Sequence, residues 1–416
     1  MGRILKFMRQ CLATFILILF NVSIYATTYY ISPGGNDSSN GTSPQTAWKT
    51  ISKLNNITLQ PGDYVLFQAG YSWREELEVT ASGTKGNLIH YGRYGEGPNP
   101  RILGSIRANN WTATGTANVW VSGTTVQQPV GRNWAEGAML IYVDDSITHA
   151  NERQASLSAL NEEFEWYYAS NRVYLYSPTD PDTRYDSVEV QQRETCMTMN
   201  NNQEESWIEV NGIDLLFAIN AGFSSGYPGI GGKEGLVFKN CKIGYIGIKG
   251  SSYGYGVEGY HANSLFENCY FSDCGRRAIS WNMYIDQYAG EQIEIRNLII
   301  RNNIFKRGYH TTSLDCSSQL SSTDIIDGVY FYNNVVDDSE IKEVGDWRGS
   351  NQIFIQNGSG DAYTNNIYVV GNVFIQSTAR NILYEGADTT YTWNNTIIGH
   401  NPNTIASPYA NVAYNG

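Results

Sequence analysis

The heptapeptide Ile299-Ile300-Arg301-Asn302-Asn303-Ile304-Phe305 carries the fold prediction, because close variants of it recur through the second half of the chain. Each copy has a short strand with alternating apolar residues, then a corner that usually contains Asn, then a second short strand. The second corner residue falls at Gly212, Cys241, Cys269, Asn303, Asn334, Asn372 and Asn395. A repeat of roughly 20 to 40 residues built from strands predicts a solenoid.

Asparagine suits such a corner for two reasons. It tolerates left-handed φ and ψ angles, and its side chain can bond to the same residue type one coil away. Alternating apolar residues then point inward along each strand and build a core from coil to coil. We therefore predict an all-β protein, a right-handed parallel β-helix. A β-sandwich also has regularly spaced strands, but it would not keep the same corner in every repeat.

The first 26 residues form a separate segment. Arg3, Lys6 and Arg9 precede an apolar run at residues 12–20, which is the pattern of a secretory signal peptide. The run is shorter than the ~20 residues that a membrane-spanning helix needs. We expect a secreted protein, extracellular or periplasmic, with no stable membrane anchor.

Residues 27–416 are expected to form one β-helix domain. A short amphipathic helix at residues 47–54 would cover the first coil, where a sheet edge is otherwise open. Residues from about 105 to 195 lack the Asn corner and are rich in Trp and Tyr. We predict that they form a β-rich insertion on the helix.

The composition excludes several classes of protein. With 30 Tyr, 10 Trp and only 16% charged residues, the chain is not a disordered one. A net charge of −12 argues against nucleic acid as a partner. Cys11 lies in the predicted signal peptide, and the other five cysteines lack metal-site spacing, so we expect buried thiols. We expect a monomer.

Several N-terminal motifs resemble those of secreted right-handed parallel β-helix carbohydrate-active proteins. They are Tyr29-Tyr30-Ile31-Ser32-Pro33-Gly34-Gly35, Trp48-Lys49-Thr50-Ile51 and Ile89-His90-Tyr91-Gly92-Arg93-Tyr94-Gly95. The aromatic segments 166–168 and 173–177 resemble the insertion of some glycoside hydrolases of this type. The resemblance covers most of the mature chain and implies a polysaccharide lyase or a glycoside hydrolase, although some members are not catalytic. Gly-His-Gly and Arg-Ile-Lys, the polygalacturonase signatures, are missing.

A column of basic residues follows the corners. Eight positions after successive corners lie Lys249, Arg277, Thr311, Lys342 and Arg380, and seven positions after two of them lie Arg276 and His310. If the coils stay in register, these residues stack about 4.8 Å apart on one wall. A basic strip on an acidic protein predicts a groove for an anionic polysaccharide. Ordinary surface cations paired with neighbouring carboxylates are the alternative.

Lyase chemistry needs a cation that neutralises a uronate carboxylate, and a base that removes the adjacent proton. Arg276 or Arg277 is the candidate neutraliser, His310 the base and Tyr309 the acid. His261, in a Gly-rich loop, is the next candidate histidine. The remaining substrate-binding candidates are Lys249, Lys342 and Arg380 for charge, and Trp281, Tyr284 and Trp347 for stacking on sugars.

Hydrolysis instead needs two carboxyl groups, ~5–5.5 Å apart for retention and ~6.5–9.5 Å for inversion. The candidates are Asp315, Asp337, Asp338, Glu340 and Asp346, of which Asp337 and Asp338 are preferred because they directly follow a strand. We therefore expect cleavage of an acidic glycan, with β-elimination slightly favoured over hydrolysis. A non-catalytic glycan-binding protein is the third alternative.

Calcium is an open question, because the resemblance includes lyases. Oxygen-rich loops lie at residues 36–40 and 180–186, but neither has the ordered ligand spacing of a dedicated calcium loop. We assign no metal site.

Overall fold

The computed structural model describes most of the chain after the predicted signal peptide. The described residues are 26–127, 139–143, 146–149, 153–199, 206–226, 233–247, 254–283, 294–308, 311–318, 325–339, 351–357, 363–377, 380–385, 389–400 and 412–415. The prediction for residues 1–25 therefore lies outside them. In the part of the chain that is described, no helix has the length and apolar character needed to cross a membrane.

Three long parallel sheets, which we name A, B and C, wind through the described residues. Sheet A has the order β1 (Thr28–Ile31), β2 (Tyr64–Gln68), β5 (Ile89–Tyr94), β16 (Ile208–Asn211), β19 (Leu236–Lys239), β22 (Ser264–Glu267), β25 (Glu294–Arg301), β28 (Ile325–Tyr332), β31 (Tyr363–Val370) and β34 (Thr390–Trp393). Sheet B has the order β3 (Ser72–Trp73), β6 (Arg101–Leu103), β17 (Asp214–Leu216), β20 (Lys242–Ile246), β23 (Tyr270–Cys274), β26 (Ile304–Lys306), β29 (Val335–Asp337), β32 (Val373–Ser377) and β35 (Thr396–His400). Sheet C has the order β4 (Leu77–Val79), β15 (Thr195–Met199), β18 (Ala221–Ser224), β21 (Tyr255–Gly259), β24 (Arg277–Met283), β27 (Thr311–Ser318), β30 (Asn351–Asn357), β33 (Arg380–Glu385) and β36 (Val412–Asn415).

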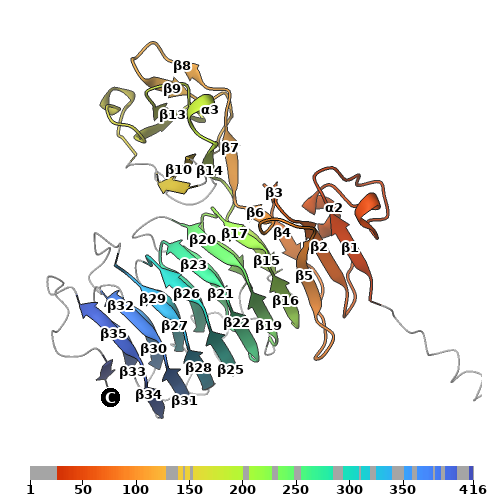
Figure 1. The fold of residues 1–416 in the computed structure, drawn as a ribbon, viewed down its shortest axis with the longest axis vertical. Helices are drawn as coiled ribbons and strands as arrows, with labels where there is room; N and C mark the ends of the chain where they lie inside the picture. Colours follow the sequence, from red (N-terminus) through yellow and green to blue (C-terminus); the bar gives the residue numbers. More distant parts are fainter. Residues whose placement is uncertain are drawn as a thin grey trace, which may run out of the picture.

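The chain visits the three sheets in turn, so each sheet receives one strand per coil (Figure 1). This is the parallel β-helix that the corner repeat predicted, and the fold prediction is confirmed. The interior is filled by a single cluster of buried apolar side chains that runs from Ile31 to Tyr384. Stacked Phe rings line part of it, for example Phe271 on Phe305 with ring centroids 5.0 Å apart.

In the corner between the sheet A strand and the sheet B strand of each coil, the two predicted roles of asparagine fall on two adjacent residues. The first corner residue takes the left-handed conformation, with φ of 58° at Asn302 and 55° at Asn333. The second residue makes the ladder: the Asn303 side-chain amide donates to Asn334 Oδ1 at 3.1 Å, and the Asn334 amide donates to Asn372 Oδ1 at 3.2 Å. Gly212, with φ of 69°, occupies the first place in its corner, so the predicted alignment was wrong there by one residue.

The N-terminal region contains the 3-10 helix η1 (Pro44–Thr46) and the short helix α2 (Ile51–Asn55). Asn55 bonds to the edge strand of sheet C, donating to Glu76 O and accepting from Glu78 N. The helix starts later than predicted because Thr50 caps it, accepting from Lys53 N. Its role as a cap for the whole solenoid stays a prediction.

Two antiparallel sheets lie between β6 and β15. One has the order β11 (Ser146–His149), β10 (Met139–Val143), β14 (Ser187–Gln191) and β7 (Ser105–Ala108); the other has β12 (Trp166–Ala169), β13 (Arg172–Tyr176), β9 (Val119–Val121) and β8 (Thr112–Ala113). The 3-10 helix η2 (Leu157–Ala159) and the helix α3 (Pro181–Arg184) accompany them. This unit has its own small core, which includes Trp111 and Trp166. Figure 1 shows it standing beyond β6 and β17.

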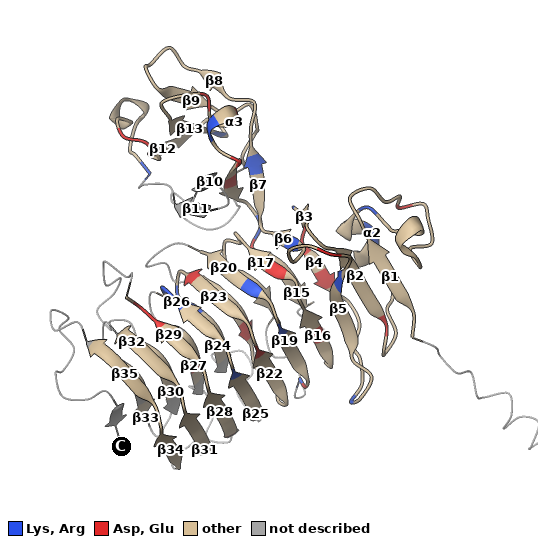
Figure 2. Ribbon diagram, viewed as in Figure 1, with Lys and Arg blue, Asp and Glu red and all other residues tan. Residues whose placement is uncertain are grey.

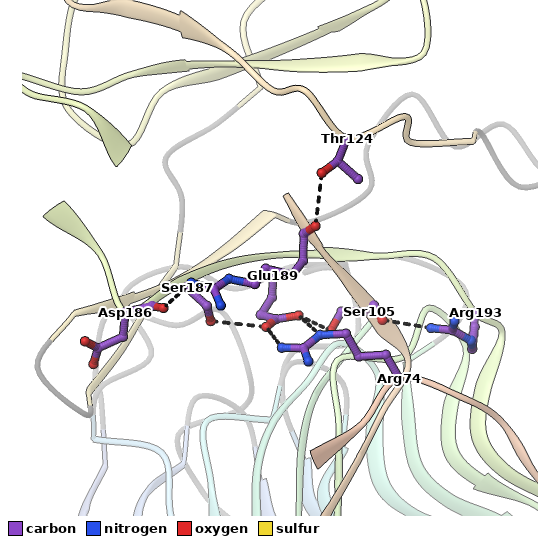
Figure 3. A network of polar contacts seen from close by, with 8 residues as sticks. Arg74, Ser105, Thr124, Asp186, Ser187, Glu189 and Arg193 are labelled. Carbon is purple, nitrogen blue, oxygen red and sulfur yellow. Dashed lines mark hydrogen bonds and ion pairs between the residues drawn. The ribbon is translucent and has the colours of Figure 1, made fainter. Parts of the chain in front are cut away.

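A buried carboxylate joins this unit to the β-helix (Figure 3). Glu189, on β14, is 1% exposed and forms an ion pair with Arg74. Ser105 donates to Glu189 Oε2 at 2.6 Å, and Ser187 donates to Oε1 at 3.1 Å. The network thus connects Ser105 of β7 and Glu189 of β14 to Arg74, which directly follows β3 of the β-helix.

Candidate functional site

One column of the outward face of sheet C carries the carboxylates Glu78, Glu258 and Asp315, of which Asp315 is fully buried. Val257, Ile279 and Leu314 belong to the core, so alternation places the residue that follows each of them on the outer face. Strand register aligns Glu258 with Ser280, and Ser280 with Asp315. We call Glu258, Ser280 and Asp315 the sheet C triad. Its carboxylates are two strand spacings apart, about 10 Å between backbones.

Asp315 forms a buried ion pair. Arg277 Nε lies 2.6 Å from Asp315 Oδ2, and the two side chains are 6% and 0% exposed. Arg277 also contacts Ser280 Oγ at 3.5 Å. Within the described part of the chain, neither oxygen of Asp315 accepts a well-aligned hydrogen bond. A buried carboxylate held by one ion contact is costly for stability, and such groups call for an explanation beyond folding.

Tyr255, on β21, contacts Arg276 and Arg277 at the start of the neighbouring strand β24. Arg276 donates to the Tyr255 hydroxyl at 2.8 Å, and both guanidinium groups lie within 6 Å of the ring, at 5.8 and 5.9 Å. Burial raises the pKa of Tyr255, although the two neighbouring charges oppose the rise. Tyr255 is therefore a neutral hydrogen-bonding group rather than an ionised base.

The corner between sheets B and C carries a second charged group. Arg307 binds Asp273 through two bonds of 2.8 Å, a bidentate pair. Lys306 Nζ lies 3.4 Å from Asp337 Oδ2. Burial acts to raise the pKa of Asp337, but bonds from Ser339 and the charge of Lys306 outweigh it, and the net shift is downward. Asp337 is thus poorly suited to be a general acid.

Strand register tests the predicted basic column directly. It pairs Arg277 with Thr311, Thr311 with Asn351, and Asn351 with Arg380. Arg277, Thr311 and Arg380 therefore share a column as the corner count predicted. Asn351 stands where Lys342 was expected, because the connection after β29 is longer than the count assumed. The predicted strip is thus interrupted, and its Arg277 charge is already paired.

The other predicted site residues fall into two groups. The prediction that Trp281 stacks on a sugar was wrong. Trp281 is 0% exposed, packs edge-on against Phe266 and donates from its indole nitrogen to His261 O at 3.1 Å, so its rings are not available to a ligand. Asp338 is 2% exposed. Lys249, Tyr284, Tyr309, His310, Lys342 and Trp347, and the side chain of Arg380, lie outside the described residues.

No cluster of three or more His, Cys, Asp or Glu in the described residues could hold a metal ion. Calcium binding, for which the sequence assigned no site, stays a prediction. The described cysteines, Cys196, Cys241, Cys269, Cys274 and Cys316, are all buried free thiols, as expected. Burial raises the pKa of Cys196 to about 12, so it is not a nucleophile at neutral pH. His261 is 0% exposed and belongs to the interior.

Glu258, Ser280 and Tyr255 were not among the residues predicted from the sequence, and Asp315 was only one of several carboxylates. A weak signal was present: Asp315 is an acidic residue between the core residues Leu314 and Cys316, and Glu258 directly follows the core residue Val257. Glu78 and Glu209 also lie between two core residues of a strand, so this pattern does not by itself distinguish a site. Asp337 and Asp338 lie at a strand end, where turn chemistry explains acidic residues.

Comparison with known proteins gives one sequence relative. No protein-family model matches the chain. A lacto-N-biosidase from Bifidobacterium longum subsp. longum is 32% identical over 102 residues, which are 22% of this chain and 6% of the relative. The match thus spans a small fraction of that enzyme's length.

Solved structures show a similar fold. XylC in complex with xylose matches with a TM-score of 0.59 and 14% identity, over 93% of this chain and 68% of XylC. A GH136 lacto-N-biosidase from Eubacterium ramulus has a TM-score of 0.46 at 12% identity, with coverage of 89% and 68%. An alginate lyase from a Paenibacillus species has a TM-score of 0.42 at 12% identity, with coverage of 88% and 96%. The likeness to XylC supports the overall fold of the chain, which its own strand order shows to be a parallel β-helix.

Proposed function

We propose that the protein is a secreted enzyme that cleaves glycosidic bonds at the outward face of sheet C. The observation that carries this proposal is the sheet C triad, in which Glu258 and Asp315 flank Ser280 on one wall. General acid–base cleavage of a glycoside uses two carboxyl groups on opposite sides of the bond. The lacto-N-biosidase segment and the fold of the XylC–xylose complex support a glycan substrate.

Hydrolysis fits this wall better than β-elimination. An eliminating enzyme needs a cation free to neutralise a uronate, but Arg277 already faces Asp315. In the proposed hydrolase, Arg277 instead positions Asp315. Because Asp315 is 0% exposed, this function requires the face to open before a glycan can reach the carboxylate. The two-strand separation of the carboxylates favours the wider arrangement, ~6.5–9.5 Å, which leaves room for water and inverts the anomeric centre.

One observation supports β-elimination as the second candidate. Arg276 and the Tyr255 hydroxyl are bonded to each other beside the triad, and an arginine with a tyrosine is a suitable pair for a uronate. The raised pKa of Tyr255 weighs against its action as a base.

A product assay separates these possibilities. The purified protein is incubated with neutral oligosaccharides, xylan, pectate and alginate, and the products are followed for new reducing ends and for the ultraviolet absorbance of unsaturated uronates. New reducing ends without that absorbance support hydrolysis, and proton NMR of the first product then gives the anomer. Absorbance on pectate or alginate would instead establish elimination. Binding without any product would make the protein a glycan-binding module.

A further inference from the structure

The outer face of sheet A carries a ladder of aromatic rings on its last described coils. Tyr330, Tyr368 and Tyr391 occupy one column of β28, β31 and β34. Their rings stack, with centroids 5.0 Å apart between Tyr330 and Tyr368 and 4.6 Å between Tyr368 and Tyr391. Trp393 stands at 89° to Tyr391 and at 81° to Tyr368. We call these four residues the aromatic ladder.

The ladder is on the surface and not part of the core. Val329, Phe331, Ile367 and Val369 are the core residues of β28 and β31, so their neighbours face outward. Tyr391 is 40% exposed and Trp393 is 46% exposed. Large aromatic side chains gathered on one exposed face usually mark a binding surface.

The charges around the ladder are few and already paired. The described strands β31 and β34 contain no charged residue, and β28 contains only Asp327 (Figure 2). Asp327 is bound by Arg296 at 2.9 Å and by the Asn366 amide at 2.8 Å. The next strand, β25, carries Arg296 and Arg301, and each forms an ion pair with a carboxylate. The described part of this face therefore offers an anionic polymer only cations that are already paired.

The polar groups at this face are hydroxyls and amides. The tyrosines of the ladder end in hydroxyl groups, and the Asn365 amide donates to the hydroxyl of Tyr363, which is itself 46% exposed. The tyrosine rings of the ladder stack on one another, so they present ring edges and hydroxyl groups to the outside, while Trp393 stands nearly perpendicular to them and is 46% exposed. An exposed aromatic surface with hydroxyls and amides beside it matches a sugar ring, which offers C–H groups on its faces and hydroxyls on its edge. The rungs also repeat at one strand spacing, about 4.8 Å, which is close to the length of a pyranose in an extended chain.

From these observations we infer that the aromatic ladder is a second glycan-binding site, separate from the sheet C wall, for an extended and uncharged stretch of polysaccharide. Sheets A and C are different faces of the helix, so the ladder would hold the polymer while the triad acts on another part of it. The inference rests on the proposed function in one respect, which is that the ligand is a glycan.

Affinity electrophoresis with native protein tests the inference, using gels that contain xylan, glucomannan, pectate or alginate. The wild type should be retarded by a neutral polysaccharide, and the retardation should persist to about 0.5 M salt, because no ion pair is involved. Trp393→Ala and Tyr391→Ala should each weaken the apparent affinity about tenfold, the effect of losing one stacking contact. Tyr391→Phe should keep it.

Tyr71→Ala is the matched control, because Tyr71 is 47% exposed and directly precedes β3, the edge strand of sheet B, away from the ladder strands of sheet A. Thermal melting of each variant shows whether it folds. Turnover of a short soluble oligosaccharide, which cannot reach both faces, should be unchanged in Trp393→Ala. This readout separates the proposed catalytic site from the proposed binding site. If Trp393→Ala loses retardation but keeps turnover, the ladder binds the polysaccharide and the catalytic site is a separate one. If the wild type has no turnover but its retardation depends on Trp393, the ladder is supported and the proposed catalytic function is not.

Three results would overturn the inference. They are wild-type mobility that no polysaccharide changes, equal retardation of wild type and both alanine variants, and a wild-type dimer that Trp393→Ala converts to a monomer without any effect on retardation. The last result would make the ladder a contact between copies of the chain.

Discussion

Removal of the Arg277 charge tests the buried pair at the proposed site. In Arg277→Met, the carboxylate of Asp315 stays 0% exposed and loses the cation that lies 2.6 Å away. An uncompensated buried charge costs about 3–5 kcal/mol. We therefore expect the free energy of unfolding in water to fall by that amount, measured by urea denaturation with fluorescence and circular dichroism as two probes.

Two further variants make this prediction specific. Arg277→Met combined with Asp315→Leu removes both charges and should recover most of the lost stability, because apolar replacement of a buried pair is often neutral. Arg184→Met is the matched control: its partner Glu163 and Arg184 itself are 28% and 37% exposed, and it should cost less than about 1 kcal/mol. A cost below about 1 kcal/mol for Arg277→Met, or a double variant no more stable than the single one, would refute the reasoning.

Three more predictions concern the scaffold. Asn334→Ala should cost about 2–5 kcal/mol in urea unfolding, because Ile300 O and Asn303 N lose their buried partner, whereas Asn40→Ala on an exposed loop should cost less than about 0.5 kcal/mol. His90 and Lys239 lower the pKa of Glu209 to about 2. Ionised Glu209 therefore contributes at most ~3 kcal/mol to the free energy of unfolding at pH values above the ordinary glutamate pKa of 4.5, and this contribution is lost as the pH falls toward 2. The difference in unfolding free energy between wild type and Glu209→Gln should decrease over the same pH range. Arg74→Ala should speed amide exchange in β7 and β14 and leave the β28 amides unchanged; equal exchange in both places would contradict the anchoring role of the Arg74–Glu189 pair.

The fold could be predicted because it depends on local residue types that repeat. A left-handed corner needs Asn or Gly, as at Asn302 and Asn333, and the next residue must fill the ladder, as Asn334 does. The left-handed residue recurs in each of these corners, and the ladder residue is Asn from Asn303 onward, after Cys241 and Cys269 in earlier coils. The repeat is therefore visible in the sequence without knowledge of which strands pair.

The site could be predicted only in part, because it depends on register across loops of unequal length. The corner count aligned Arg277 with Thr311 correctly, since few residues separate each from its corner. It failed at Lys342, where Asn351 takes the place in the column. The ion pair could not be predicted either, because the sequence does not show that Asp315 on β27 lies next to Arg277 on β24.

Turnover by variants of the sheet C triad tests the central claim most directly. Glu258→Gln and Asp315→Asn replace a carboxylate by a neutral amide of nearly the same shape. Glu78→Gln is the matched control, because Glu78 lies in the same outward column on the edge strand of sheet C. We predict that the first two lower glycan cleavage by about 10²–10⁴-fold in folded protein, while Glu78→Gln keeps wild-type turnover. Cleavage at more than half the wild-type rate in both triad variants would contradict the assignment of catalysis to this wall.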